Sequence, residues 1–151
     1  MPSRAESAVI GADAAVDAAL RLLRYRDRSA AQIDQALEAR DVGTDTREDA
    51  LETLRRTGLV NDNRFAERRA ATLAARGAGD AFIRHDLEAA GIATGVVEDV
   101  LAGLEGEQER ARRIVERRGA SAKTARYLAG KGFSTDAVHA AIARAGDEPL
   151  G

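Results

Sequence analysis

The residues that could carry out catalysis or bind a metal are few and scattered in this chain. The two histidines, His85 and His139, are isolated, with neither a second histidine nor a carboxylate at metal-ligand spacing. The chain has no cysteine, so disulfides, thiolate metal sites and a cysteine nucleophile are excluded. Neighbouring acids such as Glu98 and Asp99 point about 100° apart on a helix and form no paired-carboxylate site. We therefore predict no catalytic residue and no metal site.

Two glycine-containing segments resemble nucleotide-binding loops only in part. Gly77-Ala78-Gly79-Asp80-Ala81-Phe82 lacks the third glycine of the dinucleotide fingerprint and follows a predicted helix instead of a strand. Before Lys123-Thr124, Arg117 and Ala122 occupy the positions at which a phosphate loop has its two glycines. The first segment is better explained as a helix stop and restart. We predict no cofactor and no enzyme.

The remaining chemical signal is the placement of charge, which could bind anions. The 151 residues carry a net charge of only −2, although 32% of them are charged. Basic residues outnumber acidic ones in segments 21–28, 64–76 and 110–126, whereas acidic residues dominate 96–109 and 134–148. Such basic segments suit nucleic-acid phosphates or an acidic protein surface. The alternative is that they are solvated helix faces with local ion pairs.

The elements that position these charges are short amphipathic helices arranged as a repeat. Alanine, arginine, leucine and glutamate are abundant, prolines number two, and no segment shows strand alternation. Three bulky residues recur with intervals of 14 and 5 residues, once in each repeat. These anchors are Leu23, Leu37 and Val42, then Leu73, Leu87 and Ile92, then Ile114, Leu128 and Phe133. A period of 40 to 50 residues indicates a helical array.

The predicted fold is therefore all-α, with three tandem three-helix repeats forming an elongated, curved array. The repeats span 12–60, 61–104 and 105–146, between a disordered N-terminal tail (1–11) and a C-terminal tail (147–151). Ser29 and Thr46 are expected to open helices with capping boxes, and Thr94 and Ser134 are expected N-caps. If equivalent helices align, the first helices form one basic stripe. Its predicted members, which point away from the anchors on a helical wheel, are Arg21, Arg28, Arg64, Arg68, Arg112 and Arg113.

The charge and apolar patterns also argue against sequence-specific DNA reading and membrane association. The third helices of the second and third repeats are acidic or nearly neutral, which disfavours a major-groove recognition helix. Tyr25 and Tyr127 lie inside basic segments, where they could stack on bases, but packing inside a repeat is the more common role. No apolar run reaches the ~18 residues of a membrane span. We expect a soluble, cytoplasmic monomer with no membrane partner.

Three stretches resemble the RecX family of regulatory proteins, and the resemblance covers about residues 14–145. The most specific is Gly58-Leu59-Val60-Asn61-Asp62-Asn63-Arg64-Phe65-Ala66. It follows Leu22-Leu23-Arg24-Tyr25-Arg26-Asp27-Arg28-Ser29 at the family's distance and precedes Arg126-Tyr127-Leu128-Ala129-Gly130-Lys131-Gly132-Phe133-Ser134. One departure is Asp80, because the family often has proline after this Gly-x-Gly, together with basic residues. The middle repeat is therefore expected to touch nucleic acid less than in similar proteins.

The resemblance implies a non-catalytic bacterial protein of three tandem three-helix units. Members of the family bind along the groove of the RecA filament on single-stranded DNA, and usually inhibit its ATP hydrolysis, strand exchange and co-protease activity. The implied partners are thus the RecA filament and single-stranded DNA, the latter bound weakly on its own. Two alternatives stay open: a general nucleic-acid-binding helical array, and a protein-interaction scaffold unrelated to RecA.

Overall fold

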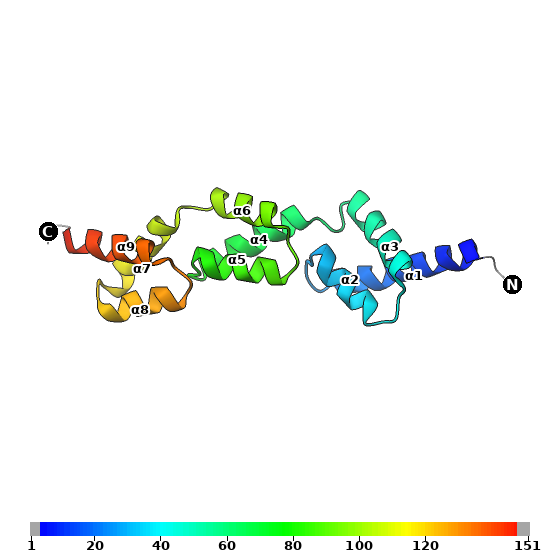
Figure 1. Ribbon diagram of the computed structural model, residues 1–151, viewed down its shortest axis with the longest axis horizontal. Coiled ribbons are helices and arrows are strands. Elements are labelled where there is room, and N and C mark those ends of the chain that lie inside the picture. The colour runs from blue at the N-terminus through cyan, green and yellow to red at the C-terminus, as the bar shows by residue number, and fades with distance from the viewer. Residues whose placement is uncertain (1–3, 148–151) are drawn as a thin grey trace. The chain divides into compact units, whose positions relative to one another are not determined.

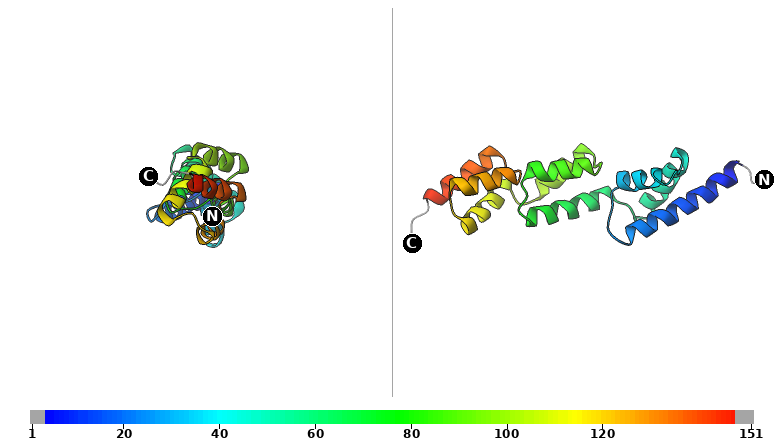
Figure 2. Two further views of the ribbon diagram at one scale, coloured as in Figure 1. Left: turned by 90° about the vertical axis from the view of Figure 1, so that its left-hand side faces the viewer. Right: turned by 90° about the horizontal axis from the view of Figure 1, so that it is seen from below.

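The computed structural model describes residues 4–147, with side chains described from residue 11 onward. This part of the chain consists of nine α-helices joined by short loops, with no strand among these residues. Figures 1 and 2 draw the helices as coiled ribbons. The helices are α1 (Arg4–Leu23), α2 (Ala30–Glu38), α3 (Thr44–Arg56), α4 (Asp62–Ala75), α5 (Asp80–Ala89), α6 (Thr94–Gly103), α7 (Glu107–Arg118), α8 (Ala122–Gly130) and α9 (Thr135–Asp147). The all-α prediction of helices in tandem groups of three is confirmed.

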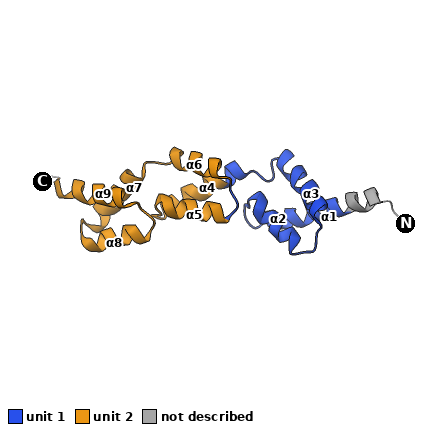
Figure 3. Ribbon diagram, viewed as in Figure 1, with its two compact units in different colours: residues 1–65, 90–92 blue, residues 66–89, 93–151 orange. Residues whose placement is uncertain are grey.

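The chain divides into two compact units (Figure 3). Unit 1 comprises residues 1–65 and 90–92, and unit 2 comprises residues 66–89 and 93–151. In unit 1, α1 packs against α3, and in unit 2, α7 packs against α9 and α5 against α6. Three helices fall in each predicted repeat, but the division into three repeat domains with the boundaries given above stays a prediction.

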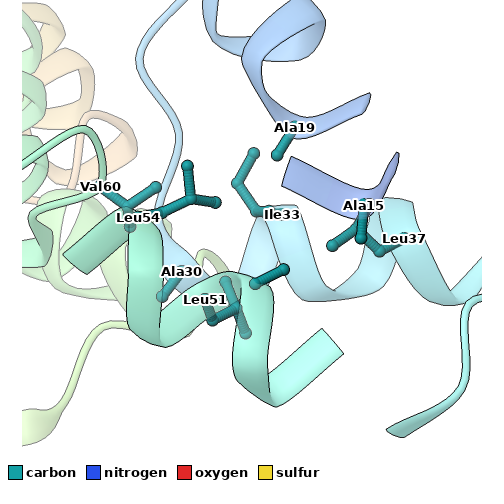
Figure 4. Packing of buried hydrophobic residues seen from close by; sticks show 9 residues of the cluster. Ala15, Ala19, Ala30, Ile33, Leu37, Leu51, Leu54 and Val60 are labelled. Carbon is teal, nitrogen blue, oxygen red and sulfur yellow. The ribbon is translucent and has the colours of Figure 1, made fainter. Parts of the chain in front are cut away.

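The core of unit 1 is thin because alanines contribute much of it. Ile33 and Leu37 of α2 form one buried cluster with Ala15 and Ala19 of α1 and the α3 residue Leu54 (Figure 4). Small side chains on α1 let the helices approach closely, so the larger side chains of α2 and α3 fill the space. Burying one leucine or isoleucine contributes about 1.5–3 kcal/mol, and this core depends on few such residues.

Unit 2 has a corresponding core at its C-terminal end. Ile114 and Val115 of α7, Leu128 of α8 and Val138 of α9 are buried together with Phe133, which follows α8. In the same unit Ile83 and Leu87 of α5 and Val97 and Leu101 of α6 are buried. The buried positions recur every three or four residues, as the predicted amphipathic helices require.

The five-residue interval between the second and third anchors arises from the way the middle helix of each repeat ends. The N–H of Val42 donates to the carbonyl oxygen of Leu37 at 3.1 Å, and Phe133 donates to Leu128 at the same distance. These bonds belong to Schellman motifs, in which the preceding residue adopts a left-handed conformation. That residue is Asp41 (φ 62°), Gly91 (φ 79°) or Gly132 (φ 93°) in the three repeats. The repeat is therefore also a repeat of helix endings.

Two equivalent junctions join the beginning of a middle helix to a Schellman turn within one unit. In unit 1 the Ser29 hydroxyl donates to the carbonyl oxygen of Ala90 at 2.6 Å. In unit 2 the N–H of Gly79 donates to the carbonyl oxygen of Lys131 at 2.8 Å. A Cβ on Gly79 would lie 2.3 Å from the backbone of Gly132, so the close approach requires glycine there. Helix ends that would otherwise lack partners thus satisfy one another.

An acidic side chain at the start of a first helix completes each junction. Asp62 of α4 accepts the N–H of Ala30 at 2.8 Å, and Glu107 of α7 accepts the N–H of Asp80 at 3.1 Å. Both N–H groups lie at the N-terminus of a middle helix, where a carboxylate is favoured by the helix dipole. The same polar contact therefore occurs in both junctions, so the repeat includes hydrogen bonds as well as apolar packing.

The helix caps were predicted correctly at two positions and wrongly at two others. Ser29 forms the predicted capping box with Gln32, and Ser134 accepts the N–H of Ala137 at 3.1 Å. The predictions for Thr46 and Thr94 are wrong, because α3 begins at Thr44 after Gly43 and α6 begins at Thr94 after Ala93. The backbone turns from extended to helical immediately after Gly43 and Ala93, without a side-chain cap.

The predicted N-terminal tail is helical over most of its length. Helix α1 begins at Arg4, so from that residue on it occupies the segment predicted as a disordered tail. Alanine and glutamate in this segment favour a helix. Residues 1–3 and 148–151 of the predicted tails lie outside the described residues. None of the described helices combines the length and the apolar character that crossing a bilayer demands.

Candidate nucleic-acid interface

The six predicted stripe arginines occupy three kinds of environment. Arg21 and Arg68 are exposed, and their side chains have no partner among the described residues. Arg28 and Arg64 are half-buried. The remaining two, Arg112 and Arg113 of α7, form ion pairs with nearby carboxylates. Arg21, Arg28 and Arg64 belong to unit 1 and the other three to unit 2.

Arg64 stabilises the turn between α3 and α4. Its guanidinium donates to the carbonyl oxygens of Gly58 at 2.9 Å and Leu59 at 3.3 Å. The same group lies 3.8 Å from the carboxylate of Asp27. These contacts explain why arginine follows the Gly58-Leu59 turn, and they leave this side chain engaged within the protein.

The charges of Arg112 and Arg113 are compensated by carboxylates. Arg112 lies 2.9 Å from Glu109 and 2.6 Å from Glu116, the i−3 and i+4 positions of its own helix. Arg113 lies 2.7 Å from Glu105. An approaching phosphate would compete with these carboxylates, which weakens the case for both arginines as its main contacts.

Arg110 belongs to the same basic segment but has a structural role. Its side chain is only 9% exposed. It donates to the carbonyl oxygens of Ala78 at 2.8 Å and Glu105 at 2.9 Å, pairs with Asp80, and lies 5.8 Å from the ring centre of Phe133. Asp80, the residue that departs from the family pattern, thus has a buried guanidinium as its partner.

Cations without an acidic partner gather instead where α7 turns into α8. We name this group the C-terminal basic corner; its members are Arg117, Arg118, Lys123 and Arg126. All four are exposed, and none has an acidic partner in the part of the chain that the structure describes. The left-handed Gly119 (φ 90°) lets the chain turn, and Ser121 caps α8 by accepting the N–H of Thr124 at 3.1 Å. The fold therefore brings the two helix ends and their cations together.

A second group surrounds the turn from α1 to α2. We name it the N-terminal basic corner; its members are Arg24, Arg26 and Arg28 in this turn and Arg40 just after α2, whose charge acts on Arg28. Burial, followed by repulsion from Arg26 and Arg40, lowers the pKa of Arg28. The Nε atom of Arg28 is buried and has no hydrogen-bond partner. The positive charge here is thus incompletely compensated by the protein.

The two tyrosines differ in their surroundings. Tyr127 packs against the core of unit 2, and the guanidinium of Arg118 lies 3.7 Å from its ring centre. Tyr25 is 87% exposed. Tyr127 therefore has the packing role that is more common for a tyrosine in a small helical repeat, whereas Tyr25 does not.

The C-terminal basic corner lies within the basic segment 110–126, but none of its members is among the six predicted stripe residues. A discriminating signal was present in the spacing of acids. Arg112 has Glu109 and Glu116 within one helical turn, whereas none of the four corner residues has an acid at i±3 or i±4. Contacts across the turns, such as those of Arg64 and Arg110, leave no comparable trace in the sequence.

The described residues contain no group of three or more histidine or acidic side chains that could hold a metal ion. His85 and His139 are both exposed. The geometry of this part of the chain therefore offers cation clusters as its main chemical feature.

Comparison with known proteins gives consistent matches. A family model described as RecX, first three-helix domain, matches residues 15–54. The regulatory protein RecX of Halorhodospira halophila is 34% identical over 146 residues, which cover 90% of this chain and 91% of that protein. The RecX of Chromohalobacter salexigens is 34% identical over 138 residues, covering 85% and 91%.

A solved structure supports the same fold. The crystal structure of RecX from Lactobacillus salivarius superposes with a TM-score of 0.79 at 22% identity, covering 91% of this chain and 98% of that one. Its helices thus follow the same course, although the sequences have diverged. Given the identity and coverage shared with the two curated proteins, this chain belongs to the RecX family.

Proposed function

We propose that this protein is a non-catalytic regulator that binds the RecA filament on single-stranded DNA and inhibits or modulates its ATPase, strand exchange and co-protease activities. Membership of the RecX family supports this function, and the relatives are named regulatory proteins. Binding across neighbouring RecA protomers would block the motions coupled to ATP turnover, so the regulator needs no chemistry of its own.

The observation that carries the proposal is a contrast between local and total charge. Two corners present cations without sufficient acidic partners, yet the whole chain has a net charge of −2. Binding to nucleic acid alone depends on neutralising phosphates, so it is weak for such a chain at physiological salt. A filament that offers both phosphates and protein surface would supply the missing binding energy.

Comparing two forms of DNA tests this proposal. Binding is measured by sedimentation with single-stranded DNA alone and with the same DNA coated by RecA. We expect weak binding to the bare strand and clear binding to the filament. Equally tight binding to bare DNA would favour the general nucleic-acid-binding array instead, and binding to neither would favour the scaffold.

Charge variants test which cations make the contact. Arg117→Gln with Arg126→Gln removes two corner charges, and Arg112→Gln with Arg113→Gln is the matched control with the same change in net charge. We expect the corner variant to weaken filament binding and to reduce the salt slope by roughly 0.7 for each lost phosphate contact. A larger effect in the α7 control would instead restore Arg112 and Arg113 as contact residues.

A further inference from the structure

We propose that the N-terminal basic corner is a nucleotide site for single-stranded nucleic acid, in which a base stacks on Tyr25 and the adjoining phosphate binds Arg26 and Arg28. The proposal rests on the proposed function, because it assigns the DNA contact of that regulator to a particular site. It goes further in predicting that the contact includes a base as well as the phosphate backbone.

The first supporting observation is the exposure of Tyr25. The chain has five aromatic residues, three phenylalanines and two tyrosines, and Tyr25 is the most exposed large apolar side chain among the described residues, at 87%. It lies in the turn after α1, where its N–H donates to the carbonyl oxygen of Leu22 at 3.3 Å. An exposed ring among cations is the arrangement with which proteins stack bases of a single strand.

The second observation is the unsatisfied charge of Arg28. Its Nε is buried without a hydrogen-bond partner, and its pKa is lowered by burial, followed by repulsion from Arg26 and Arg40. The acid of this turn, Asp27, is directed elsewhere: one oxygen accepts the N–H of Arg28 at 3.2 Å and lies 3.8 Å from Arg64, and the other is buried without a partner. A phosphate beside Arg26 and Arg28 would offset the repulsion between these cations.

The third observation is the contrast with the other tyrosine. The ring of Tyr127 is half-buried, and the guanidinium of Arg118 lies 3.7 Å from its centre, so no base can take that place without displacing the arginine. The C-terminal basic corner therefore offers phosphate contacts alone. Bases in a duplex are already stacked, so a free tyrosine favours single strands over duplex DNA.

Tyrosine fluorescence provides the test, because the chain has no tryptophan and only two tyrosines. The Tyr127→Phe variant leaves Tyr25 as the single tyrosine. It is titrated at low ionic strength with a thymidine oligonucleotide and with an abasic oligomer of equal length. We expect quenching with the thymidine oligonucleotide. Binding of labelled oligomers should give a Kd about 5- to 150-fold higher for the abasic oligomer, the range of one stacked base.

Substitutions at the ring and at the cations separate the two parts of the site. Binding of the Tyr25 variants, which have lost the fluorescent reporter, and of the arginine variant is measured with labelled oligomers. Tyr25→Ala should abolish the preference for the thymidine oligonucleotide, and Tyr25→Phe should retain it. Arg26→Gln with Arg28→Gln should weaken both oligomers alike. An absence of quenching, or an undiminished preference in Tyr25→Ala, would overturn the proposal.

Failure of the Tyr25 site and failure of the proposed regulation of RecA give different results. Inhibition of RecA by the wild-type chain, together with an unchanged preference in Tyr25→Ala, would retain the regulator and remove this site. A lost preference in Tyr25→Ala without any effect of the wild-type chain on RecA would retain the site and remove the regulator. Circular dichroism of Tyr25→Ala should match the wild type, because the exposed ring contributes little to stability.

Discussion

At the scale of single residues, the arginines of this protein divide between those that hold the fold and those whose charge is available to a partner. Arg110 and Arg64 donate to backbone carbonyls at helix ends, whereas Arg117 and Arg126 have no partner among the described side chains. A basic segment read from the sequence mixes both kinds. Exposure and the presence of an acid one turn away separate them.

Arg110→Ala should destabilise the protein far more than Arg117→Ala, although both lie on α7. The first substitution leaves Asp80 and two carbonyl oxygens without their donor, and breaking a buried pair costs about 3–5 kcal/mol. The second removes an exposed charge, with a change within about 0.5 kcal/mol. Urea denaturation followed by circular dichroism measures the difference, and equal midpoints would contradict the structural role of Arg110.

The pair between Arg69 and Asp86 should make stability depend on pH below neutrality. Two hydrogen bonds, at 2.8 and 2.9 Å, lower the pKa of Asp86 beneath its ordinary value. The stabilisation is therefore complete above the unfolded value of about 3.9 and is lost as the pH falls through the lower folded value. Because the pair is partly exposed, it contributes about 0.5–1 kcal/mol.

Asp86→Asn tests this dependence through the free energy of unfolding. The variant should be less stable than the wild type at pH 7. The gap should shrink as the pH falls below about 3.9 and close only below the lower pKa of Asp86 in the folded protein, where the carboxyl is neutral in both states. Glu98→Gln, which removes the more exposed pair with Arg84, is the matched control and should change stability less. A gap for Asp86→Asn that persists unchanged in acid would contradict the assignment.

At the scale of helices, the ends carry as much information as the apolar faces. Each repeat's middle helix ends in a left-handed residue, and the starts of α2 and α5 bond to the Schellman turns at residues 90–91 and 131–132. The sequence predicted the helices and most of their buried faces because apolar spacing records them. It did not predict the junctions, which bring together residues such as Gly79 and Gly132 that are far apart in the chain.

Ser29→Ala should cost more than Ser121→Ala, although both serines cap a helix. Loss of an N-cap costs about 1 kcal/mol in either case. Ser29 also donates to the buried carbonyl oxygen of Ala90, and an unsatisfied buried acceptor adds about 1–3 kcal/mol. Ser121 donates to no distant residue. Thermal denaturation should show the lower midpoint for Ser29→Ala, and equal midpoints would show that the junction adds nothing.

At the scale of the whole molecule, the repeat explains why the sequence was informative about fold and less so about the site. Anchors such as Leu37 and Leu128 occupy equivalent positions before a Schellman turn, so three copies of one pattern reinforced the same prediction. The candidate interface had no such redundancy. Its definition depended on which cations pair with acids, and the six residues chosen by helical wheel include two that form ion pairs on α7.

The proposed function, regulation of the RecA filament by this member of the RecX family, requires no catalysis by the protein itself. The decisive experiment is RecA ATPase activity on single-stranded DNA, measured with increasing amounts of this protein at fixed salt. We expect a dose-dependent change, in the direction of inhibition, that is weakened in the variant with Arg117→Gln and Arg126→Gln. An ATPase rate unaltered at several-fold excess of the protein over RecA would contradict it.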